Sequence, residues 1–197
     1  MEIRKATLMD CYPLAELALI AGEGIPAFFW EQSKENEQDI LAVGARNLES
    51  ESENFSYKNA HVATIEGNIA GMLLAYRLPS KEEAENLYDY PEFIRPLIEL
   101  EQCVPDSFYI NMLASYPQYR NKGIGTALMS TVNKLAQNAN CQTVSVEVFG
   151  QNEGALRLYQ RLGYHIVESR DVIPHPCHKY TGKIFLLTKA ISHEVAK

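Results

Sequence analysis

A basic, glycine-containing segment lies between Arg120 and Leu128, where a predicted strand is followed by a predicted helix. The first turn of a helix presents backbone N–H groups that have no intrahelical acceptor, together with a partial positive charge, so it suits an anion. Gly123 and Gly125 have no Cβ atom, which lets the backbone approach a phosphate closely. Arg120 and Lys122 add positive charge. The segment therefore has the ingredients of a diphosphate-binding loop.

Three phosphate-binding patterns can be compared with this segment. A P-loop requires G-x-x-x-x-G-K-S/T, which the chain lacks. A dinucleotide fingerprint requires G-x-G-x-x-G, but Leu128 occupies the place of the third glycine, although Glu147 lies about where a ribose-binding acid would. The third pattern, R-x-x-G-x-G-x-A/G-L after x-P-x-Y/F, fits every position, and Tyr116–Tyr119 supplies its first part. The third pattern describes the segment best.

With this block the sequence resembles the GNAT superfamily of N-acetyltransferases. The first block that carries the resemblance runs from Met112 to Met129. The second runs from Asn152 to Tyr164 and looks like the family's N-x-x-A-x-x-x-Y-x-x-x-G-F/Y segment. The interval between the blocks has the length of one helix and one strand, as the family requires. The two blocks together are specific where either alone is only suggestive.

The resemblance implies a role for each matching position, with acetyl-CoA as the acyl donor. Main-chain groups of Leu113 and Ser115 would pair with the pantetheine arm like an added strand, and the Leu113 amide would form an oxyanion hole. The family often has valine where Ser115 stands, and a contact through the backbone tolerates this change. Asn152 would bind the cofactor arm, and Tyr159 would protonate the departing thiolate. The pyrophosphate would be bound by the amides of Arg120, Asn121, Lys122, Gly123, Ile124, Gly125 and Thr126.

Each of these residues also has a structural interpretation. The two glycines could shape a tight turn, Tyr159 could be a core aromatic, and Asn152 could be the N-cap of its helix. The general base is open between Glu147, on a predicted strand, and Glu23, in the loop after the first helix. Each of the two glutamates could equally be an ordinary polar residue.

A second group of potential ligands lies before the last predicted strand. Asp171, His175, Cys177 and His178 are residue types that bind zinc, but their spacing matches no standard site. We expect no metal here and interpret the segment as a loop that borders the acceptor site. The acidic stretch from Glu82 to Glu101 reads most simply as a solvated surface, with attraction of a cationic acceptor as an alternative.

The elements that must position these residues follow from hydrophobic periodicity. Their order predicts a mixed α/β sheet with a parallel crossover in its second half. The resemblance implies a mostly antiparallel sheet with a central, splayed parallel strand pair and helices on both faces. We predict strands over Glu2–Lys5, Ala60–Ile65, Ile69–Tyr76, Ser107–Ala114, Thr143–Phe149, Tyr164–Ser169 and Lys183–Thr188, and helices from the Thr7–Asp10 capping box to Ala21, over Gln38–Leu48, in part of Lys81–Gln102, over Gly125–Asn138 and over Asn152–Leu162.

Length and composition exclude several classes of protein. The chain of 197 residues suits one well-buried domain, so we expect a single domain over 1–197. A net charge of −7 argues against a nucleic-acid binder, which needs a basic surface. No run reaches the ~18 apolar residues of a membrane span. Four scattered cysteines and an N-terminus without an apolar signal segment predict a reducing, cytoplasmic location.

These observations predict transfer of an acetyl group from acetyl-CoA to an amine by direct attack. The alternative is a non-catalytic acyl-CoA-binding or sensing module, which would share the pyrophosphate loop. The acceptor stays open between a small-molecule amine and the amine of a peptide or protein, as do the acyl chain and the oligomeric state, because one fold hosts many activities.

Overall fold

The computed structural model describes residues 1–35 and 39–191. Contacts within the chain divide it into two compact units. The first unit consists of Met1–Ala75, Asn111–Ser130 and Pro176–Lys179. The second consists of Tyr76–Ile110, Thr131–His175 and the chain from Tyr180 onward.

Hydrogen bonds link the strands in the order β1-β2-β3-β4-β5-β7-β6. Pairing is antiparallel between β1 and β2, β2 and β3, β5 and β7, and β6 and β7, whereas β4 and β5 are parallel. The predicted mixed, mostly antiparallel sheet with one parallel pair is confirmed. The strands are β1 Glu2–Lys5, β2 Ala60–Ile65, β3 Asn68–Arg77, β4 Phe108–Ser115, β5 Thr143–Phe149, β6 His165–Asp171 and β7 Lys183–Ala190.

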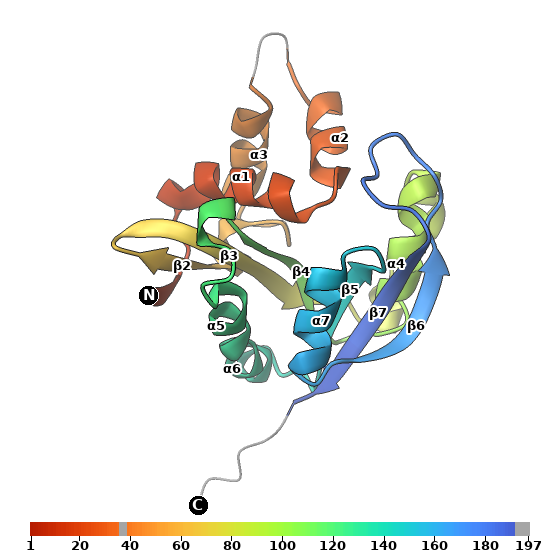
Figure 1. The fold of residues 1–197 in the computed structure, drawn as a ribbon. Helices are drawn as coiled ribbons and strands as arrows, with labels where there is room; N and C mark the ends of the chain where they lie inside the picture. The colour runs from red at the N-terminus through yellow and green to blue at the C-terminus, as the bar shows by residue number, and fades with distance from the viewer. Residues whose placement is uncertain (36–38, 192–197) are drawn as a thin grey trace, which may run out of the picture. The chain divides into compact units, whose positions relative to one another are not determined.

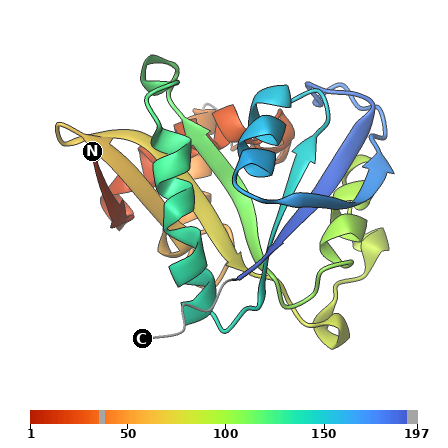
Figure 2. The same ribbon diagram turned by 60° about the horizontal axis from the view of Figure 1, so that its bottom comes forward.

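In the first unit, helices cover both faces of the β2–β3 hairpin. Figures 1 and 2 show α1, α2 and α3 on one face and α5 on the other. The predicted turn of the hairpin is confirmed, and Glu66 and Gly67 both have positive φ angles, 51° and 79°, which match the twist of the strands. The helices are α1 Cys11–Ala21, α2 Ile25–Gln32, α3 Ile40–Glu49 and α5 Ile124–Ser130.

Helix α2 was not predicted from the sequence. It begins after Gly24, whose φ of 101° favours glycine, and Pro26 lies in its first turn. A Cβ atom on Gly24 would lie 1.8 Å from the backbone oxygen of Cys177, so this turn needs a glycine for close approach as well. The start of the next predicted helix, Gln38, lies outside the described residues, and α3 ends at Glu49, one residue later than predicted.

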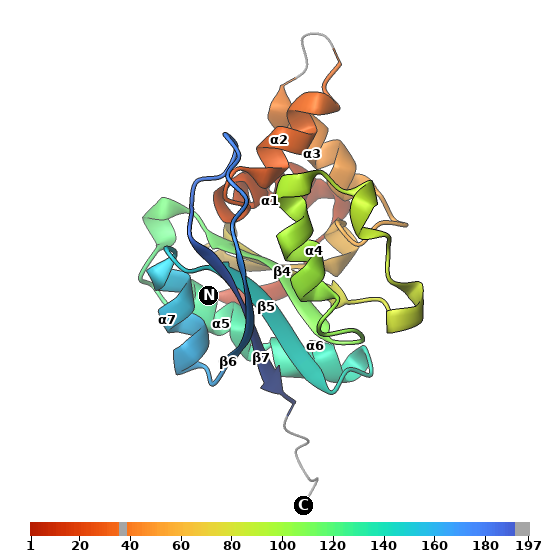
Figure 3. The same ribbon diagram turned by 90° about the vertical axis from the view of Figure 1, so that its right-hand side faces the viewer.

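In the second unit, the strands β5, β7 and β6 lie between α4 and α7 (Figure 3). Helix α4 spans Arg95–Glu101, α6 spans Val132–Asn138 and α7 spans Glu153–Arg161. Pro96 does not break the helix predicted in part of Lys81–Gln102, because it lies in the first turn of α4, where a missing N–H costs nothing.

The single helix predicted over Gly125–Asn138 is interrupted at Thr131, between α5 and α6. The Ser130 hydroxyl donates to the carbonyl oxygen of Ala127 at 2.6 Å, a side-chain bond that competes with the helical backbone pattern. Among residues 1–35 and 39–191, no helix is long and apolar enough to cross a bilayer.

Candidate functional site

The end of β4 carries the predicted main-chain contacts Leu113 and Ser115 and belongs to the first unit. Gly71 on β3 permits close packing at this end. A Cβ atom there would lie 2.5 Å from the Ala114 carbonyl oxygen and 2.7 Å from Cγ2 of Ile124, the first residue of α5. Because Gly71 has no side chain, both the end of β4 and the start of α5 can lie close to the backbone of β3 at this residue.

The loop from Arg120 to Gly123 has the conformation of an anion-binding turn. Asn121 and Gly123 have positive φ angles of 59° and 80°. The Gly123 carbonyl accepts the Ala127 N–H at 2.9 Å, so the helix begins directly after Gly123. Nothing lies within 4 Å of a Cβ atom built on Gly123, and the space beside its backbone is open. The positive φ angle favours glycine at position 123, and the open space beside its backbone leaves room for a ligand.

Arg120 and Lys122 are exposed in this loop. Neither forms an ion pair with a carboxylate in the part of the chain that the structure describes, and the Lys122 ammonium lies 5.4 Å from the centre of the Tyr119 ring. The N–H groups of Ile124, Gly125 and Thr126 lie in the first turn of α5, where helices lack intrahelical acceptors. The loop thus offers amides and two uncompensated cations to an anion.

Tyr116 ties the end of β4 to the first helix. Its backbone N–H donates to the Ala70 carbonyl at 3.0 Å, and its hydroxyl donates to Oε2 of Glu16 at 2.5 Å. The same hydroxyl lies 3.4 Å from the carbonyl oxygen of Pro13. These bonds hold the strand end and the loop that follows it against α1.

Glu23, one of the two predicted candidates for the base, lies in the turn between α1 and α2. Its side chain is 10% exposed, and its carboxylate lies 3.5 Å from the ammonium of Lys179. Its carbonyl oxygen also accepts the Lys179 N–H at 3.1 Å. Glu23 therefore fixes the 176–179 segment against this turn.

Asn152 and Tyr159 lie on α7 in the second unit. The Asn152 side chain accepts the Ala155 N–H at 3.3 Å, so its structural interpretation as an N-cap is confirmed. Tyr159 is 5% exposed, and its ring lies edge-on to Tyr164 with centroids 5.8 Å apart. Burial raises the pKa of Tyr159, so its phenol keeps its proton at neutral pH.

Glu147, the other candidate for the base, lies on β5 in the second unit. Its Oε2 accepts the Tyr109 hydroxyl at 3.5 Å. Its Oε1 is buried and has no hydrogen-bond partner among the described residues. Burial raises the pKa of Glu147 well above the ordinary carboxyl value, and the nearby charge of Glu101 raises it further.

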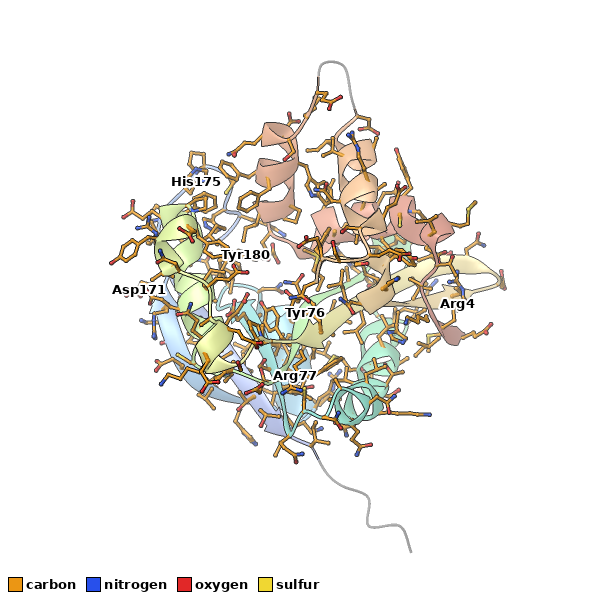
Figure 4. The ribbon with its side chains drawn as sticks, turned by 180° about the vertical axis from the view of Figure 1, so that it is seen from behind. Arg4, Tyr76, Arg77, Asp171, His175 and Tyr180 are labelled. Carbon is orange, nitrogen blue, oxygen red and sulfur yellow. The ribbon has the colours of Figure 1, made fainter. Side chains whose placement is uncertain are left out.

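The segment before β7 is held by contacts of other kinds. Asp171 accepts a hydrogen bond from Lys183 at 2.9 Å, and the His175 ring stacks on Phe93 with centroids 3.9 Å apart (Figure 4). Among residues 1–35 and 39–191, no group of three or more His, Cys, Asp and Glu side chains could hold a metal ion.

A family model decides what kind of protein this is. The model described as "Acetyltransferase (GNAT) family" matches residues 25–164. The chain belongs to the GNAT acetyltransferase family. The resemblance drawn from the two sequence blocks is thereby confirmed.

One curated relative of this GNAT chain shares a part of its sequence. The N-alpha-acetyltransferase MAK3 of Arabidopsis thaliana is 39% identical over 56 residues, which are 28% of this chain and 30% of that protein. The match thus spans less than a third of the length of this curated relative.

Two solved structures resemble the chain over nearly its whole length. The polyamine N-acetyltransferase of Drosophila melanogaster has a TM-score of 0.66 at 20% identity, covering 96% of this chain and 99% of that one. The protein yncA of Salmonella typhimurium, solved with its cofactor acetyl-CoA, has a TM-score of 0.60 at 15% identity and covers 100% and 97%. At such identities the likeness shows the fold.

The acyl donor of the GNAT family is acetyl-CoA, and the loop of this chain fits its diphosphate. The open space beside Gly123, the first turn of α5 and the two cations without ion pairs among the described residues are compatible with a diphosphate. The residues would bind it through the amides from Arg120 to Thr126.

Three polar residues beside the candidate site escaped the sequence analysis. Tyr116 was noted as part of a motif, but its bond to Glu16 joins residues 100 positions apart. Tyr109 was assigned only to a strand, and Glu101 only to an acidic, solvated stretch. Glu101 is only partly exposed, and burial raises its pKa to about 7, so it differs from a fully solvated surface carboxylate. For Tyr109, the available signal was the alternation of polar side chains at Tyr109 and Asn111 on one face of β4, continuing that of Ser107 just before the strand.

Proposed function

We propose that this GNAT chain is an N-acetyltransferase that moves the acetyl group of acetyl-CoA onto an amine by direct attack. The observation that carries the proposal is the Arg120–Gly123 loop, with its positive φ angles and uncompensated cations, in a chain that the family model matches. We propose further that both units act as one acetyltransferase domain over 1–197, because β4 contributes residues to each of them.

The donor is held by main-chain amides and by one side chain in this proposal. The amides from Arg120 to Thr126 bind the diphosphate, and main-chain groups of Leu113 and Ser115 pair with the pantetheine arm. Asn152 contributes its amide group to the same arm while it caps α7. Support for these roles comes from the match of each position to the family's two sequence blocks.

Bound acetyl-CoA supplies an activated thioester, so no covalent enzyme intermediate is needed. The Leu113 N–H donates to the thioester oxygen and stabilises the charge that develops there as the amine attacks. Tyr159 donates its proton to the departing thiolate, and burial keeps its phenol protonated until the thiolate forms.

An ammonium group must lose a proton before it attacks, and we assign this step to Glu147. A base near neutral pH needs a pKa above that of an ordinary carboxylate, and burial raises the pKa of Glu147 in this direction. Glu23 is the second candidate, but its ion pair with Lys179 favours the ionised form and makes it the weaker proton acceptor.

Calorimetric titration with acetyl-CoA tests the donor site. The Gly125→Glu variant places a side chain and a negative charge in the diphosphate site, so we expect binding to the wild type and loss of binding in the variant. Lys134→Glu is the matched control, since it makes a larger charge change at an exposed position of α6. A folded wild type that does not bind acetyl-CoA contradicts the proposal.

One observation favours the alternative, an acyl-CoA-binding or sensing module. The raised pKa of Glu147 increases the fraction of its carboxyl that is already protonated, and only the ionised fraction can accept a proton. Turnover on a panel of amines separates the two functions. Acetyl-CoA binding without acetylation of any amine supports the sensor, whereas formation of any N-acetyl product supports the enzyme.

The acceptor we propose is an amine, either a small molecule or part of a peptide or protein. The curated relative MAK3 is named for alpha-amines and the Drosophila structure for polyamines, so amines of different sizes are acceptors among similar proteins. A cytoplasmic location is part of the proposal and agrees with four cysteines that form no disulfide in the described residues.

A further inference from the structure

A cluster of buried polar side chains in the second unit joins two carboxyl groups to one phenol. Glu147 comes from β5, Tyr109 from β4 and Glu101 from the last turn of α4. Tyr109 is 5% exposed, and its hydroxyl donates to Glu147 at 3.5 Å. The ring of Tyr76 lies edge-on to Tyr109 at 5.8 Å and closes one side of the cluster (Tyr76 is labelled in Figure 4).

The Tyr109 hydroxyl acts on both carboxyls, since it lowers the pKa of Glu101 and that of Glu147. A phenol has one proton and can donate it to one carboxylate at a time. The other carboxylate must then hold a proton of its own or meet a cation. The buried Glu147 Oε1, which has no partner among the described residues, marks the place where that proton or cation would lie.

The described part of the chain supplies no cation to this cluster. Neither Glu101 nor Glu147 forms an ion pair there with Lys, Arg or His. Buried carboxylates are ordinarily paired or neutral, because an unpaired buried charge is costly. Besides the two carboxyls themselves, the ionisable groups that act on the pair are Glu85, Cys103 and Tyr109. Glu85 and Cys103 raise its proton affinity, and the Tyr109 hydroxyl lowers it by donating a hydrogen bond.

We propose that Glu101, Tyr109 and Glu147 form a paired-carboxylate site that receives the ammonium group of the acceptor amine. The inference rests on the proposed acetyl transfer and names its acceptor as a cationic amine. Glu147 takes one proton from the ammonium, the neutral amine forms a C–N bond as the C–S bond breaks, and Tyr159 protonates the thiolate. The second proton, which the new amide nitrogen loses, restores the Tyr159 phenol by way of solvent. Glu101 is a positioning residue, because it acts on Glu147 through Tyr109 and through its negative charge.

Two variants should change the pH dependence in opposite directions. Glu101→Gln removes the charge that raises the pKa of Glu147, so the midpoint of the acidic limb of kcat/KM should move to lower pH by about one unit. Tyr109→Phe removes the donor that lowers this pKa, so the midpoint should move to higher pH. A residue that only supports the fold would lower the rate without moving the midpoint.

Glu99→Gln is the matched control, because Glu99 lies on the same helix but is 40% exposed and paired with Arg170. We expect an unmoved midpoint in this variant. An equal shift in Glu99→Gln, or no shift in both Glu101→Gln and Tyr109→Phe, overturns the proposal.

A second measurement does not depend on turnover. Carbon NMR of protein with isotope-labelled glutamate follows the Glu147 carboxyl from about pH 4 to about pH 9, with Glu147→Gln identifying its signal. Butylammonium, the simple cationic probe, should move this titration to lower pH in the wild type and less in Glu101→Gln. An unmoved titration refutes the ammonium site. Acetyl-CoA binding without acetylation of any amine refutes the proposed acetyl transfer. The Glu147 titration with butylammonium then still shows whether the cluster binds an ammonium group.

Discussion

At the residue scale, burial has a larger effect than ion pairing on the pKa values of the side chains proposed to act in the site. Tyr159, Tyr109 and Glu147 all have raised pKa values, with burial as the largest cause. The effect keeps the phenols protonated and makes the carboxyl a stronger proton acceptor. One physical cause thus favours the protonated form of both the phenols and the carboxyl.

The Tyr159→Phe variant tests the acid. It keeps the ring contact with Tyr164 and removes only the hydroxyl, which forms no hydrogen bond to the residues that the structure describes. We expect kcat to fall about 100-fold, within the range of general-acid effects, with little change in acetyl-CoA affinity. Steady-state kinetics and calorimetry provide the measurement, and an unchanged kcat would show that the phenol serves packing alone.

Glu101 should make stability depend on pH. Its carboxyl has a pKa of 4.5 ordinarily and about 7 in the fold, so the folded state binds the proton more tightly. The stability from the neutral carboxyl is fully present below about pH 4.5 and is lost as pH rises through about 7. Glu101→Gln cannot ionise, so it should exceed the wild type by on the order of 2 kcal/mol above this window and match it at lower pH. Urea unfolding at both ends of the window measures the difference, and a constant difference contradicts the assignment.

At the scale of elements, glycines decide how closely neighbouring segments approach. Gly24 lies against the Cys177 backbone, and Gly71 lies against the end of β4 and the start of α5. Both close contacts lie in the first unit, which also contains the diphosphate loop. The two glycines thus allow close approach of the segments that lead to the diphosphate loop and of the turn after α1.

Gly24→Ala and Gly182→Ala form a matched pair. Both positions have positive φ, 101° and 82°, so alanine is strained at each by about 1 kcal/mol. Only at Gly24 would the new Cβ meet backbone, at 1.8 Å, whereas nothing lies within 4 Å at Gly182. We expect Gly24→Ala to lose about 2 kcal/mol more stability than Gly182→Ala in chemical denaturation. Equal losses would show that backbone strain alone requires the glycine.

Elements whose signals are local could be predicted from the sequence. The bounds of β5 match the prediction because a β-branched run between polar residues specifies a strand by itself, and the Glu66–Gly67 turn specifies the hairpin. Helix α2 could not be predicted, because it depends on a turn that packs against residues about 150 positions away. The Glu101–Tyr109–Glu147 cluster escaped for the same reason, since its members come from three elements.

At the scale of the whole molecule, contacts divide the chain into two units, yet β4 contributes to both. Residues Phe108–Ile110 of this strand pair with β5 in the second unit, and Asn111–Ser115 belong to the first. A continuous strand cannot unfold in one unit without freeing hydrogen-bonding groups in the other. This arrangement favours cooperative unfolding.

Trp30 provides a test, because it is the one tryptophan of the chain and is buried in the first unit. Its fluorescence reports unfolding of that unit, whereas far-ultraviolet circular dichroism reports both. We expect the two urea transitions to coincide, as they do for a single cooperative domain. Separate midpoints would reveal two domains that unfold independently.

The order of the strands leaves β1 and β6 at the edges of the sheet, where unpaired backbone groups can recruit strands of other molecules. Edge β6 presents the exposed side chains Ile166 and Val167, and its register with β7 is irregular between Ile166 and Glu168. The charged residues Glu168 and Arg170 come next along the strand. Charges and bulges of this kind oppose aggregation between sheet edges. Concentrated protein should therefore resist fibril formation, and replacing Glu168 and Arg170 with threonine would extend a β-branched run into an aggregation-prone segment.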